Sequence, residues 1–307
     1  MRSYSHPTTV ERARPLLGTR VTIRVQALNP AEANAAIDAA FGAIENVHRL
    51  MSFQSPDSDL SRLNREALHG PVQIDAHTYH VLECAQQFAA ASNGVFDINC
   101  AAQLVEWGLL PRVQENVADD NGGDWRDLAL LAHYRVRFHR PLCIDLGGIA
   151  KGYAVDCAIA ALQECGITNA CVNAGGDLRL IGACTERVAI RACGHDDRAA
   201  AVLEIRDAAV ASSNGHPLRR LHHGRWVGPH LHGTAREPVD TGITATVVAP
   251  DCMSADALTK IVLADPAVAA GLLPRYDALA YRHLAARGWQ AIGDTPQPAT
   301  AIDAACA

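Results

Sequence analysis

The segment from residue 143 to residue 182 constrains the fold more than any other part of the chain. It predicts, in order, a strand, a glycine turn, a helix, a second strand and a second glycine turn. Apolar residues alternate with smaller ones over residues 142–146, as in a half-buried strand. Small apolar residues then recur at three- and four-residue steps from Ala150 to Cys165, and Gly166 follows where a helix commonly ends.

The two glycine turns in this segment can expose several backbone N–H groups. Gly147 and Gly148 form the first turn, Lys151 stands in the first turn of the helix, and residues 173–177 form the second glycine turn. Backbone donors and a lysine at a helix start suit a phosphate. The alternative is an ordinary pair of turns with a solvated lysine, because the spacing matches neither the P-loop nor the G-x-G-x-x-G pattern.

Composition narrows the class of protein. Apolar residues make up 49% of the 307 residues and charged residues 20%, which is typical of a globular chain. The net charge of −6 argues against a nucleic-acid partner, and an anionic cofactor would need a local positive site or a metal. The ten cysteines lack metal-site spacing, and no apolar run approaches the roughly 18 residues that span a bilayer. We therefore expect a cytoplasmic protein without a membrane anchor.

The remaining pattern is that of a mixed fold. Helices are predicted from Asn29-Pro30 to Met51, over residues 76–92, and after Pro250 with Ser254 as N-cap. Further strands are predicted at residues 16–25, 135–138 (in a hairpin with 142–146), 170–172, 187–191, 202–205, 209–213 and 244–249. Residues 113–127 read as a polar surface loop, and residues 216–238 show no periodicity. We expect one α+β unit over residues 1–295 and a loose tail over 296–307.

A series of motifs, in this order along the chain, resembles the FAD:protein FMN transferase family, often called ApbE. The motifs are L-G-T at 17–19, M-S-F-Q-S-P-D-S-D-L-S-R-L-N at 51–64, F-D-I-N at 96–99, L-V-E-W-G at 104–108, I-D-L-G-G-I-A-K-G-Y-A-V-D at 144–156, V-N-A-G-G-D-L at 172–178 and T-V-V-A-P-D-C-M-S-A-D-A-L-T at 246–259. The resemblance implies a mixed α+β fold with FAD in a cleft between sheet and helices. It also implies transfer of FMN from FAD to a Thr or Ser of an acceptor protein, with AMP released and Mg²⁺ required.

The resemblance also implies a set of site residues. Asp256 and Thr259 lie three apart at a helix start, so both can face one point, and their oxygens suit Mg²⁺. The family motif adds the carbonyl of Ala150 as a third ligand. The residues expected to contact the flavin nucleotide or to border its cleft are Met51, Ser52, Phe53, Asp97, Asp145, Gly147, Gly148, Lys151, Asn173, Gly175, Gly176 and Asp177. Lys151 is also expected to stabilise charge during catalysis.

The chain departs from the family where an H-x-x-D-P-x-T-G element is usual. Residues 228–238 read G-P-H-L-H-G-T-A-R-E-P instead, so the usual acid and base are missing. His230 and His232 are the candidate replacements, because an imidazole titrates near pH 6.5, which suits a general base. Three hypotheses remain: a flavin transferase with an altered acceptor side, an FAD pyrophosphatase that uses water, and a non-catalytic FAD-binding protein. The first is preferred.

Overall fold

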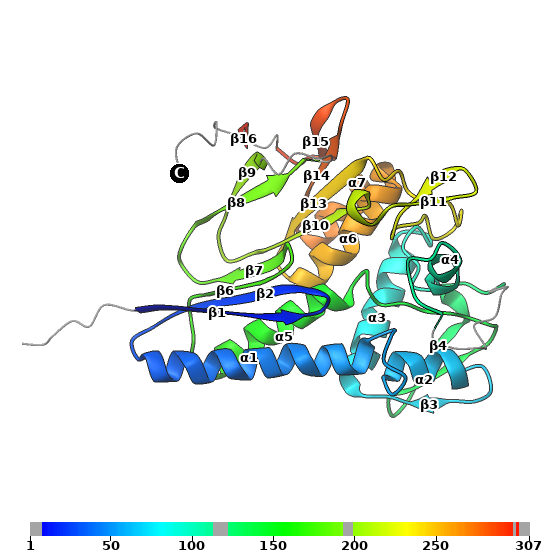
Figure 1. Ribbon diagram of the computed structural model, residues 1–307, viewed down its shortest axis with the longest axis horizontal. Coiled ribbons are helices and arrows are strands. Elements are labelled where there is room, and N and C mark those ends of the chain that lie inside the picture. Colours follow the sequence, from blue (N-terminus) through cyan, green and yellow to red (C-terminus); the bar gives the residue numbers. More distant parts are fainter. Residues whose placement is uncertain (1–7, 113–121, 193–198, 297–298, 301–307) are drawn as a thin grey trace, which may run out of the picture.

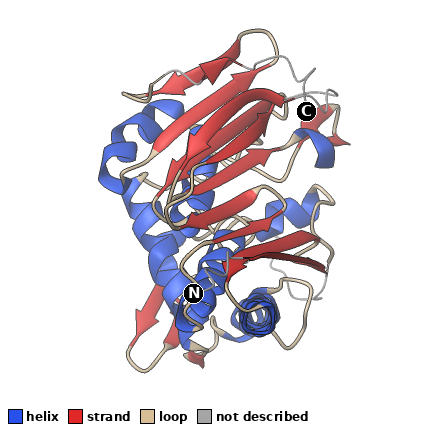
Figure 2. Cartoon of the chain, turned by 90° about the vertical axis from the view of Figure 1, so that its left-hand side faces the viewer, coloured by secondary structure: helices blue, strands red, loops and turns tan. Residues whose placement is uncertain are grey.

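The structure, a computed structural model, describes residues 8–112, 122–192, 199–296 and 299–300. Its centre is an eight-stranded antiparallel sheet, with helices gathered along one of its faces (Figures 1 and 2). The strands, in their order across the sheet, are β1 (Thr8–Leu16), β2 (Thr19–Ala27), β6 (Ala170–Ala174), β7 (Asp177–Ile181), β10 (Ala209–Asn214), β13 (Ile243–Ala249), β14 (Leu279–Leu284) and β15 (Gly288–Ile292). The expected α+β class is confirmed.

Three long helices pack against the sheet. They are α1 (Pro30–Met51), α5 (Ala150–Glu164) and α6 (Cys252–Ala264), and their apolar faces join alternate residues of the strands in one buried core. The sequence predicted α1 and α5 at nearly their observed bounds. The expected N-cap of α6 was wrong: Asp251, not Ser254, caps it, because the Asp251 side chain accepts a hydrogen bond from the Ser254 N–H at 2.7 Å.

The opposite face of the sheet is covered in part by β8 (Glu186–Arg191) and β9 (Ala199–Ile205), which pair with each other. Leu178 and Leu180 of β7 point to this face and belong to a second, smaller apolar cluster with Leu203 of β9. A two-residue strand, β16 (Ala299–Thr300), pairs with β9. Of the expected tail, residues 297–298 and 301–307 lie outside the described residues.

Four further helical elements and a small three-stranded sheet form the end of the molecule beyond α1. The helices are α2 (Asp59–Glu66), α3 (Ala76–Ala91), α4 (Ala101–Glu106) and the short η1 (Trp125–Asp127). The strands, in order across this sheet, are β3 (Val72–Gln73), β5 (Arg135–Phe138) and β4 (Leu128–Leu131). Of the expected polar loop at 113–127, residues 113–121 lie outside the described residues.

The predicted hairpin between residues 135–138 and 142–146 is wrong. Residues 142–146 form no strand: all but Asp145 are buried, without the expected alternation, and β5 pairs with β3 and β4. Side-chain amides bond this backbone instead. Asn64 bonds both the N–H and the carbonyl of Ile144, at 2.8 and 2.9 Å, and the Asn99 side chain accepts from the Cys143 N–H at 2.8 Å.

The segment without periodicity, residues 216–238, contains short elements only. They are η2 (His216–Leu218) and a hairpin of β11 (Arg220–His222) with β12 (Arg225–Val227). Near the C-terminus, α7 (Pro266–Leu272) and η3 (Leu273–Tyr276) lead into β14. Within the described residues, no helix combines the length and the apolar character that crossing a membrane requires.

Candidate functional site

Two lysines and two aspartates meet where α5 and α6 approach β7 and β10. Lys151 of α5 forms an ion pair with Asp177 of β7, and Lys260 of α6 forms one with Asp256 of the same helix. The Lys260 ammonium also donates to the hydroxyl of Ser213 on β10, at 2.9 Å. Both aspartates are fully buried, whereas the lysine side chains stay partly exposed, so the ammonium groups form the outer layer of the cluster.

A glycine allows the two helices to come together here. A Cβ added at Gly152 of α5 would lie 2.2 Å from the carbonyl oxygen of Cys252 and 2.8 Å from the Cα of Met253, so only glycine fits. The close approach lets the Gly152 N–H donate to Asp256 Oδ2 at 3.1 Å. The first turns of α5 and α6 are therefore in direct contact at the buried carboxylate.

Asp156 fixes the start of α6, although it was not among the site residues expected from the sequence. Its carboxylate accepts from the N–H groups of Cys252 and Met253, at 3.0 and 2.8 Å, and from Arg179 at 2.7 Å. The N–H groups of a first helical turn have no partner within the helix, so a carboxylate there is favourable. Asp156 is the last residue of the I-A-K-G-Y-A-V-D motif. It lies four residues after Gly152, on the same face of the helix, and that spacing was the available signal.

The ion pairs shift the pKa values of the cluster. Burial favours the neutral form of Asp256, but the ammonium groups of Lys260 and Lys151 and the Gly152 N–H outweigh burial and hold the pKa of Asp256 below its ordinary value. Burial lowers the pKa of Lys151; Asp256 opposes this shift and the nearby Lys260 adds to it. The carboxylate of Asp256 is thus ionised at neutral pH, with a cation already beside it.

A cavity of about 250 Å³ opens beside this cluster. Its walls are mainly apolar, and its polar lining comes from Asp97, Asp145, the first glycine turn, His230 and Lys260. Asp145 braces the turn, since its side chain accepts from the Gly147 N–H at 3.0 Å. At Gly148 an added Cβ would lie 3.5 Å from Cε of Lys260, so the turn and the lysine side chain are in contact distance.

His230 lies in this cavity, but its expected titration near pH 6.5 is wrong. Burial, and then the positive charge of Lys260, lowers the pKa of His230 to about 3. The imidazole is therefore neutral throughout the physiological range. His232 does not line this cavity: its Nδ1 accepts from the Ala235 N–H at 3.2 Å, and the ring closes the turn over residues 232–236.

The second glycine turn lies at a larger cavity, of about 980 Å³, on the face of the sheet opposite the helices. Asn173, Gly175 and Gly176 line it. The Asn173 side chain accepts from the Gly176 N–H at 2.9 Å, which holds the turn closed. Gly175 has φ +67°, and a Cβ there would lie 2.4 Å from the Thr19 hydroxyl oxygen, so the turn requires glycine.

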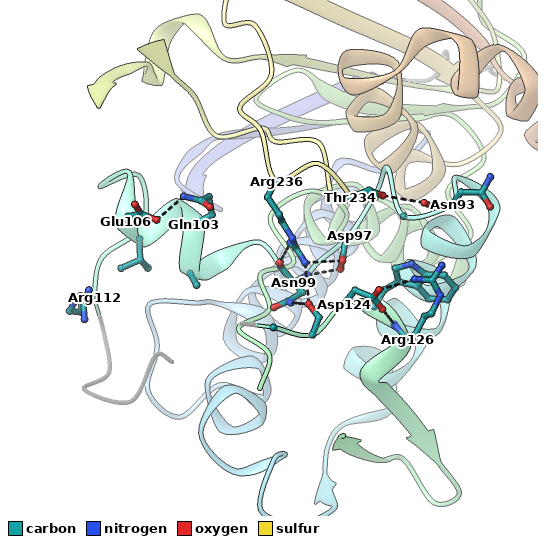
Figure 3. Close-up of a pocket in the computed structure, with 17 residues that line it drawn as sticks. Asn93, Asp97, Asn99, Gln103, Glu106, Arg112, Asp124, Arg126, Thr234 and Arg236 are labelled. Atoms are coloured by element: carbon teal, nitrogen blue, oxygen red, sulfur yellow. Dashed lines mark hydrogen bonds and ion pairs between the residues drawn. The ribbon is translucent and has the colours of Figure 1, made fainter. Parts of the chain in front are cut away.

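A third cavity, of about 700 Å³, lies over the F-D-I-N motif (Figure 3). Arg236 reaches into it from the 230–238 loop, contacts the carbonyl of Asn99 and lies 3.3 Å from Asp97 Oδ2. Burial raises the pKa of Asp97, although the Asn99 N–H and Arg236 oppose this rise. Asp97 also borders the cavity that contains His230. The altered loop is therefore tied to the first half of the chain by an arginine.

The three residues expected to line a flavin cleft lie elsewhere. Met51 and Phe53 are buried members of the main core at the end of α1. Ser52 caps that helix: its N–H donates to the His48 carbonyl, and its hydroxyl accepts from the Ser55 N–H at 3.3 Å. None of the three lines the cavities described above.

Comparison with known proteins shows which sequences and structures this chain resembles. A curated FAD:protein FMN transferase from Vibrio cholerae is 27% identical over 259 residues, which cover 80% of this chain and 78% of that protein. One from Treponema pallidum is 28% identical over 280 residues, covering 80% and 76%. The solved flavin transferase ApbE from Vibrio cholerae has a TM-score of 0.78 at 23% identity and covers 94% of this chain and 98% of its own.

The ApbE protein from Thermotoga maritima also shares the fold, with a TM-score of 0.80 at 24% identity over 94% of this chain and 97% of its own. The sequence profile of the ApbE family matches residues 17–279, which is most of the chain and includes every motif on which the resemblance depends. This protein is thus a member of the ApbE family.

Proposed function

We propose that the protein transfers FMN from FAD to a Thr or Ser hydroxyl of an acceptor protein and releases AMP. Relatives that align over about four-fifths of the chain carry the name FAD:protein FMN transferase. The observation that carries the proposal is Lys260 beside a glycine turn at the edge of a mainly apolar cavity, with the second lysine, Lys151, in the same cluster of ion pairs. Ammonium groups next to a turn suit a pyrophosphate, and an apolar cavity suits a flat ring.

The reaction replaces one P–O bond by another. The acceptor oxygen bonds to the phosphorus of the FMN half, the bond from that phosphorus to the bridging oxygen breaks, and AMP leaves with that oxygen. Negative charge grows on the leaving phosphate, so the groups that matter are the cations and N–H donors that face it. Lys260 and the backbone N–H of Gly148 at the cavity, with Lys151 in the same cluster, are the candidates in this chain, since the Gly147 N–H already donates to Asp145.

The hydroxyl proton needs an acceptor during this step. His230 is the imidazole in the cavity, and its pKa of about 3 means that its ring is neutral at physiological pH. The same low pKa makes it a weak base, so we propose that it receives a hydrogen bond from the acceptor hydroxyl and orients it, while the hydroxyl proton is released to solvent as AMP leaves. His232 has a backbone N–H on its ring nitrogen and is not assigned a role in the reaction.

The residues expected to bind Mg²⁺ do not fit a divalent cation. The Thr259 hydroxyl donates to the Asp256 carbonyl at 2.6 Å and lies 2.7 Å from the Ser213 hydroxyl. The Asp256 carboxylate, the expected charged ligand, is already paired with the Lys260 ammonium. Ala150, whose carbonyl was the third expected ligand, is the first residue of α5. Among the residues that the structure describes, no three His, Cys, Asp or Glu side chains form a metal-binding group. We therefore assign no step to a metal.

The test is incubation of the purified protein with FAD and candidate acceptor proteins, followed by mass spectrometry of acceptor peptides and chromatography of nucleotides. We expect FMN on a Thr or Ser and AMP in solution in equal amounts. Asp177→Asn is an informative variant, because Asp177 is the partner of Lys151 and its loss should misplace the ammonium. FMN and AMP without a modified acceptor would instead identify an FAD pyrophosphatase. Tight FAD binding without AMP would identify a non-catalytic flavin-binding protein.

A further inference from the structure

The chain contains only two lysines, and both lie in the candidate site. Lys151 and Lys260 stand among 27 basic residues, and all the others are arginine. An arginine carries its charge on a wide, flat group, whereas a lysine ends in a compact ammonium with three donors. Both lysine ammonium groups of the chain are therefore at this cluster.

The surroundings of the Lys260 ammonium resemble those of a bound metal ion. Three oxygens from two elements face it: the Asp256 carboxylate, the Thr259 hydroxyl at 3.1 Å and the Ser213 hydroxyl at 2.9 Å. Carboxylate and hydroxyl oxygens are the hard ligands that Mg²⁺ takes. These oxygens hold the ammonium in place, and because the Ser213 and Thr259 hydroxyls also lie 2.7 Å from each other, one of the three N–H donors can turn from a hydroxyl to a phosphate.

A divalent cation and this ammonium exclude each other. A metal on Asp256 would have to displace Lys260 from the carboxylate, and it would still face the ammonium of Lys151, which also acts on Asp256 electrostatically. Asp177 is already paired with Lys151, so the cluster offers no spare carboxylate. The two ion pairs leave the cluster close to neutral, and a doubly charged ion would make it strongly positive.

We propose that Lys260 is a built-in cation that replaces the divalent metal, so that this site binds the pyrophosphate of a dinucleotide without Mg²⁺. The proposal rests on the proposed function for the identity of the dinucleotide, FAD. Asp256 is fully buried, while the Lys260 side chain is 15% exposed, so the carboxylate binds the ammonium from the buried side and leaves part of the lysine accessible. Lys260 also lines the cavity together with Gly147 and Gly148, where a phosphate would meet it.

The wild-type protein gives the first test. Titration with Mn²⁺, followed by the EPR signal of the free ion, reports binding at an oxygen site without any assay of activity. We expect no Mn²⁺ binding at Asp256. Any weak Mn²⁺ binding elsewhere should be the same in Asp256→Asn as in the wild type. The affinity for FAD in EDTA should equal the affinity for FAD in excess Mg²⁺ within about twofold, and the same should hold for inorganic pyrophosphate. A manganese site that depends on Asp256, or FAD binding that requires Mg²⁺, would overturn the proposal.

Lys260→Met gives the second test, because it removes the ammonium and keeps most of the side-chain length. We expect FAD affinity in EDTA to fall by about 10- to 100-fold, the loss typical of a charge-assisted hydrogen bond. The oxygens of Asp256, Thr259 and Ser213 should then accept Mn²⁺. The matched control is Lys260→Met with Asp256→Asn, which should bind no Mn²⁺. Unchanged FAD affinity in Lys260→Met would show that the lysine is only the partner of a buried aspartate.

Failure of this proposal is distinct from failure of the proposed function. FAD that binds and reacts only with Mg²⁺ would contradict the built-in cation and leave FMN transfer standing. FAD that fails to bind under either condition would contradict FMN transfer, while the manganese titration of the wild type would still decide whether Lys260 excludes a metal. The wild-type measurements also stand if Lys260→Met does not fold.

Discussion

Replacing Gly152 by alanine should destabilise the protein and disturb the candidate site at once. The new Cβ would lie 2.2 Å from the Cys252 carbonyl oxygen, 2.6 Å from its carbon and 2.8 Å from the Met253 Cα. These are backbone atoms, so no rotamer change relieves the contact. Since carbon and oxygen need roughly 3.3 Å, the start of α6 must withdraw by about 1 Å.

Three effects set the expected magnitude of the Gly152→Ala change. Overpacking of this kind costs about 1–3 kcal/mol, and weakening the hydrogen bond from the Gly152 N–H to the Asp256 carboxylate adds about 1.5 kcal/mol. Alanine gains about 1 kcal/mol over glycine inside a helix. We therefore expect the free energy of unfolding to fall by about 1.5–3.5 kcal/mol.

The same substitution at Gly42 is the matched control. Gly42 lies within α1, and an added Cβ there would have nothing within 4 Å, so only the gain in helix propensity of about 1 kcal/mol remains. Urea unfolding followed by far-UV circular dichroism measures both variants. FAD affinity should fall in Gly152→Ala and stay unchanged in Gly42→Ala. A Gly152→Ala protein as stable as the wild type, with the same urea slope, would refute the close approach of α5 and α6.

Two further predictions concern the altered loop. Because the pKa of His230 is lowered to about 3, its ring is neutral above that pH. AMP release by His230→Ala should therefore be slower than wild type but keep the same pH profile from about pH 5 to 8. A wild-type inflection near pH 6.5 that is lost in His230→Ala and kept in the exposed control His223→Ala would contradict that pKa. Arg236→Ala should lower the free energy of unfolding by about 2–3 kcal/mol at neutral pH, because it leaves the buried Asp97 carboxylate without its cation. The raised pKa of Asp97 rises further in that variant, so the loss of unfolding free energy should shrink as pH falls and the carboxyl gains a proton. The control is Arg225→Ala, whose ion pair with Glu237 is exposed; it should cost less than about 0.5 kcal/mol in urea unfolding at both neutral and acidic pH.

Local signals predicted α1, α3 and α5 well because the ends of these helices have their own chemistry. The Asn29 side chain accepts from the Ala31 N–H at 2.9 Å and Pro30 starts α1, as the sequence indicates. Gly166 follows α5 with φ +80°, the conformation that a glycine after a helix commonly adopts. Such contacts lie within a few residues of each other, so a single sequence contains them.

Strand partners were harder to predict because they come from distant parts of the chain. Leu142, Ile144 and Leu146 are buried as expected, but Cys143 between them is buried as well, so burial does not alternate. The pattern also does not reveal that the side chains of Asn64 and Asn99 and the backbone of Ile98 and Ala101 bond this segment in place of a neighbouring strand. The edge strand β1 was not predicted. Its residues are largely exposed or half-buried and include Pro15, so the sequence lacks the apolar contrast that marks a strand.

The spacing at the candidate metal site was ambiguous for a reason specific to helices. Residues three and four positions after Asp256 both lie on its side of α6, so Thr259 and Lys260 are equally eligible neighbours. The Thr259 hydroxyl turns back to the Asp256 carbonyl, a common choice for threonine in a helix, while the longer Lys260 side chain extends to the carboxylate. Ser213 reinforces that choice from β10, 47 residues away in sequence, so no spacing rule could contain it. A helical aspartate followed by a lysine at the fourth position should therefore be tested for an internal cation before it is assigned to a metal.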